Sequence, residues 1–341
     1  MKTILSGLSP TEIAETLQLK PFQGRQVFGW LHGKRVFDFD AMTNLSKDLR
    51  ARLKEEFLPV GTAVVRVQHS QDAPGTRKVL VQLHDGEHVE AVLIKDGERT
   101  TVCLSVQVGC SLGCAFCATG SAGFTRDLTA GEIVEQALHL LQQENLEGRT
   151  PNIVFMGMGE PFRNYDATMR SVALLMDSDG LGIGARRITV STVGIVPGIR
   201  RFAGEGGQIR LSVSLHAAND ALRAQLVPVN RQYPLADVRG ALQDYCTQTR
   251  RQFTVEWTLL RDVNDAPQHA AELVRWLDGL KAAVNLIPYN PVEGLPYAPS
   301  SRAACRAFLQ ELVRHGIKAT LRAERGGDIA AACGQLRQRA L

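Results

Sequence analysis

From residue 100 onward, short apolar runs alternate with segments whose apolar residues lie three and four positions apart. The runs are typical of strands and the intervening segments of helices, a repeat that predicts parallel strands covered by helices on the outside. The runs are TTVCLSVQVG, NIVFMGMG, RITVSTVG, IRLSVSL, FTVEWTLL and VNLIPYN. Six units predict an α/β fold with an open, partial (β/α)6 barrel, because a closed barrel needs eight. We expect the chemistry where the strands end at their C-terminal edge.

The first 60 residues follow a different pattern. Pro10 follows Ser9 at a cap-like helix start, and apolar residues then recur at helical spacing without strand-like alternation. After Pro59 and Gly61, VGTAVVRVQ and RKVLVQLHD around DAPG predict a β-hairpin. The expected parts are a small helical domain at 1–60, a β-hairpin extension or linker at 61–95, the barrel core at 96–325 and a C-terminal tail at 326–341.

Composition excludes several classes of protein. Of the 341 residues, 44% are hydrophobic and 22% charged, which excludes intrinsic disorder. No run approaches about eighteen apolar residues and the start lacks a long apolar signal segment, so we expect neither a membrane span nor export. The net charge of +4 permits a nucleic-acid partner without arguing for one. Seven cysteines without an export signal argue against a disulfide framework and predict a cytoplasmic protein.

Three of the cysteines lie within eight residues, directly after the first predicted strand, in the sequence CSLGCAFC. Cys110, Cys114 and Cys117 can surround one side of a metal cluster, and thiolate-only ligation suits zinc or iron–sulfur chemistry. A structural zinc ion needs a fourth ligand, yet residues 118–138 contain neither cysteine nor histidine. Three ligands on a four-iron cluster leave one iron open for a substrate or cofactor. Structural zinc and buried, unreactive thiols are the alternatives.

A glycine-rich turn, FMGMGEP at residues 155–161, follows the second predicted strand. Glycines let the backbone approach a ligand closely, and Glu160 can accept a hydrogen bond from an ammonium group. A glycine-rich turn after a strand is usually only a turn. By itself this segment is therefore a weak indication of a ligand site.

Two further cysteines stand outside the loop. Cys103 lies seven residues before Cys110 on the same predicted strand, at the opposite parity. Cys333 lies in GGDIAAACGQL, whose small residues are poor core material and predict a mobile tail bearing one thiol. Taken alone, each is more often a buried apolar residue than a reactive group. Cys246 and Cys305 lie in helical stretches at no motif, and we expect both to be packing residues.

Several motifs, in order, closely resemble one family. They are VCLSVQVGCSLGCAFCATGSAGFTRDLTAGEIVEQ, FMGMGEP, STVGIVPGIRR, SVSLHAAND, NLIPYNP and AACGQL. The family is that of the dual-specificity ribosomal and transfer RNA adenine carbon-2 methyltransferases (RlmN-type) of the radical S-adenosylmethionine (SAM) superfamily. The resemblance spans residues 88–336, and the N-terminal segment resembles the family's accessory, RNA-binding domain. It implies a radical SAM barrel that holds a [4Fe–4S] cluster and uses two SAM molecules per turnover.

The substrates that the resemblance implies are adenines of 23S ribosomal RNA, at the peptidyl transferase centre, and of transfer RNA, just 3′ of the anticodon. Carbon 2 of adenine is not nucleophilic, so SAM cannot methylate it by direct displacement and a radical must add instead. One alternative is the sister group that methylates carbon 8 of the same ribosomal adenine and confers antibiotic resistance. Another is a non-catalytic, zinc-stabilised RNA-binding protein.

The resemblance also implies roles for individual residues. Cys110, Cys114 and Cys117 match the cluster ligands. Cys333 matches the cysteine that a first SAM methylates, and the 5′-deoxyadenosyl radical from a second SAM takes hydrogen from that methyl group. The carbon radical then adds to the adenine, leaving the RNA covalently joined to Cys333.

Two more residues complete the implied reaction. Cys103 matches the thiol that attacks the Cys333 sulfur, which forms a disulfide and frees the methylated base. Glu90 matches the family's proposed proton acceptor, although an ordinary solvated strand residue is an equal alternative. The positions that match SAM contacts lie at predicted strand ends: Gly159, Glu160, Ser191, Ser214, Leu215, His216 and Asn290. Taken alone, His216 is more often a satisfied interior histidine.

RNA contacts are less evident from the residues themselves. Basic side chains in the N-terminal segment are interleaved with acidic ones, whereas the C-terminal region is more clearly basic. The C-terminal candidates for phosphate contacts are Arg302, Arg306, Arg314, Lys318, Arg322 and Arg325. Such charges are usually a solvated face, and phosphate binding is the functional alternative. The expected partners are 23S rRNA, tRNA and a low-potential electron donor of the flavodoxin or ferredoxin kind, and we expect a monomer.

Overall fold

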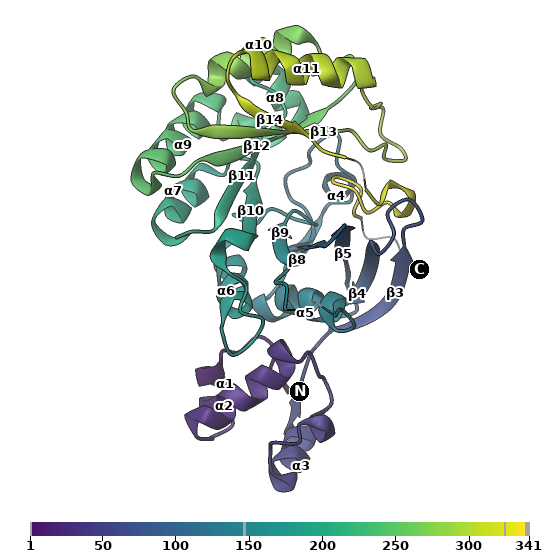
Figure 1. Cartoon of the computed structure of the whole chain (residues 1–341), viewed down its shortest axis with the longest axis vertical. Coiled ribbons are helices and arrows are strands. Elements are labelled where there is room, and N and C mark those ends of the chain that lie inside the picture. The colour runs from purple at the N-terminus through teal and green to yellow at the C-terminus, as the bar shows by residue number, and fades with distance from the viewer. Residues whose placement is uncertain (1, 146–147, 324, 338–341) are drawn as a thin grey trace.

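The N-terminal helices lie at one end of the molecule, below the sheet in Figure 1. A computed structural model describes residues 2–145, 148–323 and 325–337; residues 338–341 of the expected tail lie outside the described residues. Helix α1 begins at a capping box, in which Glu12 N donates to the Ser9 side chain and Ser9 N donates to Glu12. The elements here are β1 (Thr3–Ile4), α1 (Pro10–Thr16), α2 (Pro21–Phe28), the π-helical turn η1 (Gly29–Gly33), η2 (Phe39–Ala41), α3 (Lys47–Glu56) and β2 (Phe57–Leu58).

A ten-stranded sheet runs through the described residues in the order β14-β13-β12-β11-β10-β9-β6-β5-β4-β3. Strands β6 and β9 to β14 run parallel to one another, whereas β5, β4 and β3 continue the sheet from β6 in antiparallel fashion. The strands are β3 (Ala63–His69), β4 (Arg77–Gln82), β5 (His88–Asp96), β6 (Arg99–Cys103), β9 (Asn152–Phe155), β10 (Ile188–Thr192), β11 (Arg210–Ser214), β12 (Phe253–Leu259), β13 (Ala282–Pro288) and β14 (Lys318–Leu321). This arrangement confirms the α/β partial barrel, and the predicted hairpin extends the barrel sheet.

Helices cover the outer, convex face of the parallel strands (Figure 1). Strand β12 shows why: Trp257 points outward and packs against Phe308 of α11, whereas Glu256 and Thr258 line the barrel interior. The helices are α4 (Ala118–Ser121), α5 (Ala130–Leu141), α6 (Tyr165–Met176), α7 (Val196–Glu205), α8 (Asp220–Leu226), α9 (Leu235–Thr249), α10 (Pro267–Leu277) and α11 (Arg302–Arg314), with the short turns η3 (Ala185–Arg187), η4 (Pro228–Arg231) and η5 (Gly327–Ile329). None of the helices in the described part of the chain is long and apolar enough to cross a membrane.

The first predicted strand is divided in two, so the expectation that Cys103 and Cys110 share a strand is wrong. Strand β6 ends at Cys103, and β7 (Gln107–Gly109) pairs with β8 (Phe124–Asp127) in a separate two-stranded sheet. The chain leaves the barrel sheet between them, where Val106 N donates to the Met158 carbonyl. A further parallel strand, β14, was not among the six apolar runs because it is a short edge strand without a continuous apolar run.

Candidate active site

The cysteine loop wraps tightly because two glycines adopt left-handed backbone conformations. Gly109, at the end of β7, has φ +76°, and a Cβ there would lie 2.0 Å from the Gly123 carbonyl oxygen. Gly113, inside the loop, has φ +62°. The loop is held on both sides, because Cys110 N donates to Gly123 O at 2.7 Å and Ala115 N donates to Leu226 O at 3.0 Å.

The three loop thiols lie close enough to influence one another. Burial raises the pKa of Cys110 to about 12, and the neighbouring charges of Cys117 and Glu160 add to this effect. Burial also raises the pKa of Cys114 well above its ordinary value, again with contributions from both other thiols. Buried thiolates that repel one another need a nearby positive charge, which a metal cluster supplies, so this donor set fits a [4Fe–4S] cluster. Within the described ranges, no three His, Cys, Asp or Glu side chains are arranged to hold a single metal ion.

A cavity of about 150 Å³ opens beside this loop, at the C-terminal ends of the parallel strands. Its wall includes the side chains of Cys114 and Cys117 together with Cys333 from the tail. Five residues expected to contact SAM line it: Gly159, Glu160, Ser191, Ser214 and His216. The cavity therefore brings together the cysteine loop, the glycine-rich turn and the ends of β10 and β11.

Glu160 is buried in this cavity and both of its oxygens are engaged. Oε1 accepts from Phe162 N at 3.0 Å and Oε2 from Val193 N at 2.9 Å. Burial raises the pKa of Glu160 to about 7. A bound ammonium group would favour the charged carboxylate. The preceding residue must be glycine, because Gly159 has φ +95° and a Cβ would lie 2.5 Å from Gln107 Cβ.

His216 adopts a left-handed conformation, with φ +61°, at the end of β11. Its Nδ1 accepts from Thr258 N at 3.0 Å, so the ring proton lies on Nε2. Burial, together with the charge of Arg223, lowers the pKa of His216 to about 3. The neutral ring rests edge-on against Phe116 of the cysteine loop, with ring centroids 4.7 Å apart.

Two of the expected SAM contacts lie elsewhere. The Leu215 side chain is fully buried and does not line the cavity. Alternate residues of an extended chain point to opposite sides, which explains why Ser214 and His216 reach the cavity and Leu215 does not. Asn290 lines the neighbouring cavity, where its Oδ1 is buried without a hydrogen-bond partner in the described chain.

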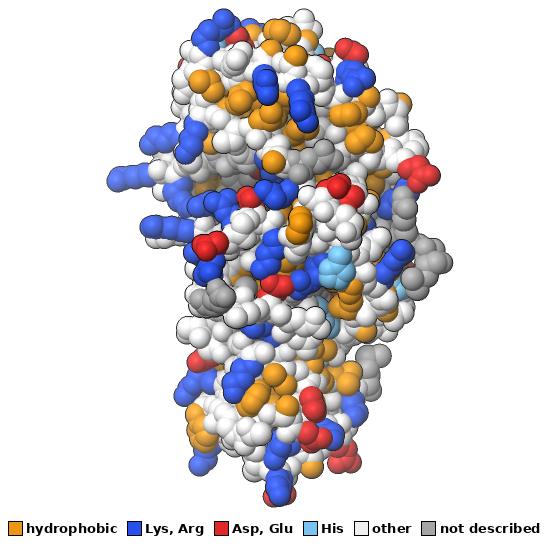
Figure 2. Space-filling view, turned by 45° about the vertical axis from the view of Figure 1, so that its right-hand side comes forward, with side chains coloured by type: hydrophobic (Ala, Val, Ile, Leu, Met, Phe, Trp, Pro, Cys, Tyr) orange, Lys and Arg blue, Asp and Glu red, His pale blue; other side chains and the backbone are white. Residues whose placement is uncertain are grey.

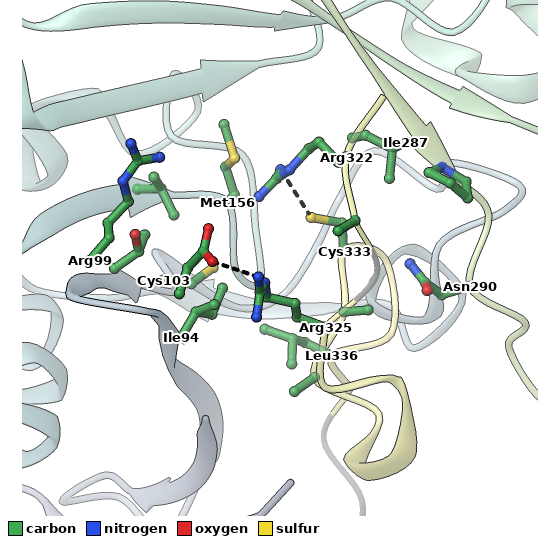
Figure 3. Close-up of a pocket in the computed structure, with 17 residues that line it drawn as sticks. Ile94, Arg99, Cys103, Met156, Ile287, Asn290, Arg322, Arg325, Cys333 and Leu336 are labelled. Carbon is green, nitrogen blue, oxygen red and sulfur yellow. Dashed lines mark hydrogen bonds and ion pairs between the residues drawn. The ribbon is translucent and has the colours of Figure 1, made fainter. Parts of the chain in front are cut away.

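That neighbouring cavity, of about 310 Å³, contains the two other cysteines of interest. Cys103 reaches it from β6 and Cys333 from the C-terminal tail (Figure 3). Cys333 also lines the first cavity. Both are free thiols. Burial raises the pKa of Cys103 to about 12, and the charge of the Cys333 thiolate adds to the rise. Arg322 Nη1 donates to Cys333 Sγ at 3.8 Å.

The tail that carries Cys333 is fastened to the barrel, so the expectation of a mobile tail finds no support in the contacts. Asp328 accepts from Ser70 Oγ and Gln71 N, each at 2.7 Å. Further along, Ala118 N donates to Gly334 O at 2.8 Å. Ala331 and Ala332 are buried, as is the larger Leu336, so small residues of this segment do contribute to the core.

Glu90 belongs to this fastening. It is buried rather than solvated, with Oε1 2.8 Å from Lys78 Nζ and Oε2 accepting from Arg337 N at 3.0 Å. It lines neither of the two cavities. The structure therefore does not bring Glu90 together with the thiols.

Sequence reasoning missed two cationic residues near the site. Arg223 is fully buried beneath the cysteine loop, where it donates to Val193 O, Leu215 O and Asn230 Oδ1. Burial lowers the pKa of Arg223 to about 10, and the Cys114 thiolate opposes that shift. Arg322 was a candidate for phosphate contacts, with a solvated face as the alternative, but its contact with Cys333 was not predicted. The only sequence signal for Arg223 is a charged residue on a helix directly after a strand-end motif.

The barrel, the C-x3-C-x2-C loop and the glycine-rich turn define a radical SAM protein. A model of the radical SAM superfamily matches residues 104–274, and a model described as the ribosomal RNA large subunit methyltransferase N-terminal domain matches residues 8–58. Membership of the superfamily implies a [4Fe–4S] cluster and SAM. The chain belongs to the RlmN family of dual-specificity RNA methyltransferases, as its relatives establish.

Three of these relatives are similar over nearly the whole chain. A probable dual-specificity RNA methyltransferase RlmN of Moorella thermoacetica is 47% identical, covering 98% of this chain and 96% of its own. The dual-specificity RNA methyltransferase RlmN of Halorhodospira halophila is 46% identical, covering 97% and 92%. The crystal structure of a radical SAM methyltransferase from Sphaerobacter thermophilus superposes with a TM-score of 0.94 at 47% identity, covering 98% and 99%.

Proposed function

We propose that this protein methylates carbon 2 of adenine in 23S ribosomal RNA and in transfer RNA. The observation that carries the proposal is the position of Cys333, which lines both the cavity beside the cysteine loop and the cavity of Cys103. One sulfur can thus face a methyl donor on one side and a second thiol on the other. The family membership and the printed names of the relatives supply the substrate class.

Cys110, Cys114 and Cys117 would hold the cluster, and the first cavity would hold SAM, with two molecules used per turnover. When bound, these groups supply the methyl group and the radical chemistry that an unreactive aromatic carbon requires. Glu160 would receive the SAM ammonium, and the Nε2–H of His216 would donate to an acceptor in the cavity. Ser191 and Ser214 offer hydroxyl groups at neighbouring strand ends.

Cys333 and Cys103 would act in sequence. The Cys333 thiolate would accept the methyl group, so that a new carbon–sulfur bond forms while the methyl–sulfonium bond of the donor breaks and the donor leaves as a neutral thioether. After the RNA has become joined to that carbon, Cys103 would attack the Cys333 sulfur; the carbon would leave with the electron pair of the broken carbon–sulfur bond and take up a proton to complete the methyl group. The disulfide that forms takes two electrons out of the thiols, so an external thiol reductant must restore them.

Glu90 remains our candidate for the proton acceptor, although its contacts support a second use that we develop below. Its carboxylate would have to exchange Lys78 or the Arg337 amide for the substrate before it could take a proton. Asn290, with an unpartnered Oδ1 in the Cys103 cavity, would accept a hydrogen bond from SAM or from the target base.

RNA would approach the face on which the second cavity opens. Figure 2 shows more Lys and Arg than Asp and Glu side chains across the middle of one face of the molecule. Arg99 and Arg322 line the cavity itself. The N-terminal helical part would add contacts, and the target base must leave its stack to reach Cys333. The low-potential donor, the monomeric state and the cytoplasmic location remain predictions.

Nucleoside mass spectrometry tests the proposed function. The anaerobically reconstituted protein is incubated with SAM, reductant and either RNA that lacks the modification. We expect 2-methyladenosine from both RNAs. Finding only 8-methyladenosine would identify the sister activity, and finding no methylated adenosine would overturn the proposal.

A further inference from the structure

A buried ion pair on the barrel wall contacts the tail on both sides of Cys333. Lys78 on β4 and Glu90 on β5 lie 2.8 Å apart, Nζ to Oε1, and their side chains are only 7% and 8% exposed. Lys78 Nζ also donates to Ala330 O at 3.2 Å, three residues before the thiol. Glu90 Oε2 accepts from Arg337 N at 3.0 Å, four residues after it. One pair of side chains thus closes the loop 330–337 at both ends.

Burying this ion pair costs free energy of desolvation, and its contacts with the loop 330–337 suggest what the pair is for. Removing a lysine and a carboxylate from water is expensive, and such pairs add little net stability compared with apolar residues of the same size. A buried pair of this kind instead selects one arrangement of the groups that satisfy it. Here those groups are two backbone atoms of the loop that carries Cys333.

We propose that Lys78 is a positioning residue for Cys333, acting through Glu90 and Ala330 to hold the loop 330–337 against β4 and β5. The inference rests on the proposed function, because it gives the loop geometry its purpose. Held at both ends, the loop presents the sulfur where the two cavities meet. Without the clamp, the same loop loses its two attachments to β4 and β5, and only contacts such as Ala118 N to Gly334 O still hold the segment around the sulfur.

Hydrogen–deuterium exchange of the cluster-loaded protein, without SAM or RNA, tests the clamp. In Lys78→Met we expect amide exchange in 330–337 to rise on the order of ten-fold, while exchange in β12 and β13 stays unchanged. Lys78→Arg, which can still reach both partners, should restore slow exchange. The matched control is Lys95→Met, since Lys95 on β5 pairs with Glu144 at 2.6 Å and its Nζ donates to Thr100 Oγ1 at 2.9 Å.

Alkylation gives a second measurement. With the loop released, the rate at which iodoacetamide modifies Cys333 should change several-fold in Lys78→Met and not in Lys95→Met. Should Lys78→Met fail to fold, Glu90→Gln removes the charge at nearly constant shape and should also speed exchange at Arg337. Unchanged exchange across 330–337 in both variants would overturn the clamp. That result would leave the proposed function standing, since nucleoside analysis judges the function separately.

Discussion

Arg322 and Cys333 meet at the junction of the two cavities, where Arg322 Nη1 donates to Cys333 Sγ at 3.8 Å (Figure 3). The thiolate of Cys333 raises the pKa of Arg322, and the charges of Glu256 and Cys103 act in the same direction. Arg322 directly follows β14, and its backbone N donates to Leu286 O of β13, so the barrel sheet positions the backbone of this residue. A fixed cation beside a thiolate stabilises the charge that a nucleophilic sulfur carries.

Replacing Arg322 should therefore slow the chemistry of Cys333. In Arg322→Gln we expect alkylation of Cys333 by iodoacetamide at pH 7 to slow by about ten-fold, because a charge-assisted contact to the sulfur is lost. Arg325→Gln is the matched control, since Arg325 pairs with Asp96 at 2.5 Å. Peptide mass spectrometry measures the rate at each cysteine. Equal rates in the wild type and in Arg322→Gln would remove this role.

Cys103→Ala should stop the reaction after the RNA has become attached. Without the Cys103 thiol nothing attacks the Cys333 sulfur, so RNA covalently joined to Cys333 accumulates while turnover falls to a single event or less. Denaturing electrophoresis and mass spectrometry of the nuclease-treated protein detect the adduct. Normal turnover without any adduct would show that Cys103 does not resolve the intermediate.

Cluster loading should depend on each loop cysteine. We expect the anaerobically reconstituted protein to be brown with about four irons per chain, and Cys110→Ala, Cys114→Ala and Cys117→Ala to lose most of that iron. Cys246→Ala is the control, since Cys246 is buried in α9 away from the loop. Metal analysis decides the matter, and one zinc per chain in the wild type would contradict this expectation.

Gly159→Ala should destabilise the protein and weaken SAM binding. The new Cβ would lie 2.5 Å from Gln107 Cβ, and the residue would remain at φ +95°. Gly182→Ala separates the two causes, because Gly182 has φ +58° with nothing within 4 Å of a Cβ. We expect the free energy of unfolding to fall by about 1 kcal/mol in Gly182→Ala, and by at least twice that in Gly159→Ala. Denaturant unfolding measures the loss of stability and equilibrium binding measures the loss of SAM affinity. Equal losses of stability in the two variants would show that the structure relieves the close contact at Gly159.

Acid should destabilise the N-terminal helices through His32. Burial lowers the pKa of this histidine to about 4, and its ring stacks on Phe28 with centroids 3.9 Å apart. The folded-state pKa lies below the ordinary 6.5, so between pH 6.5 and 4 the unfolded chain binds a proton that the folded chain does not. The contribution of the neutral His32 to folding stability is therefore fully present above pH 6.5 and is lost as the pH falls towards 4. The contribution is about 3 kcal/mol at most. Between pH 7 and 4, the free energy of unfolding should depend less steeply on pH in His32→Phe than in the wild type. The same pH dependence in both proteins would exclude His32 as the cause.

Periodicity predicted the barrel because its strands are apolar and its helices are amphipathic, each with its own repeat. The same signal could not show that TTVCLSVQVG breaks after Cys103, because both halves are apolar and extended. The break depends on contacts with the later segment 154–158, including Val106 N to Met158 O. Strand β14 escaped for the opposite reason, since an edge strand needs no apolar run.

The site shows the same division between local and distant information. Strand-end positions such as Ser191 and Ser214 were predictable, because parallel strands end at a common edge. The attachment of the tail to the sheet was not predictable, since Lys78 and Ala330 are 252 residues apart and the sequence near each residue contains no motif that indicates the contact. The small residues around Cys333 favoured a mobile tail, whereas in the structure side chains of β4 and β5 hold the tail by hydrogen bonds.

The three hydrogen bonds of Arg223 have a consequence for how the protein withstands loss of its cluster. They join the segment after β10, the segment after β11 and the turn η4 into one frame around the cysteine loop, with no help from iron. Because all three acceptors belong to the protein chain, we expect this frame to persist when the cluster is lost. A damaged molecule could then be repaired by inserting a new cluster, without a fresh round of synthesis.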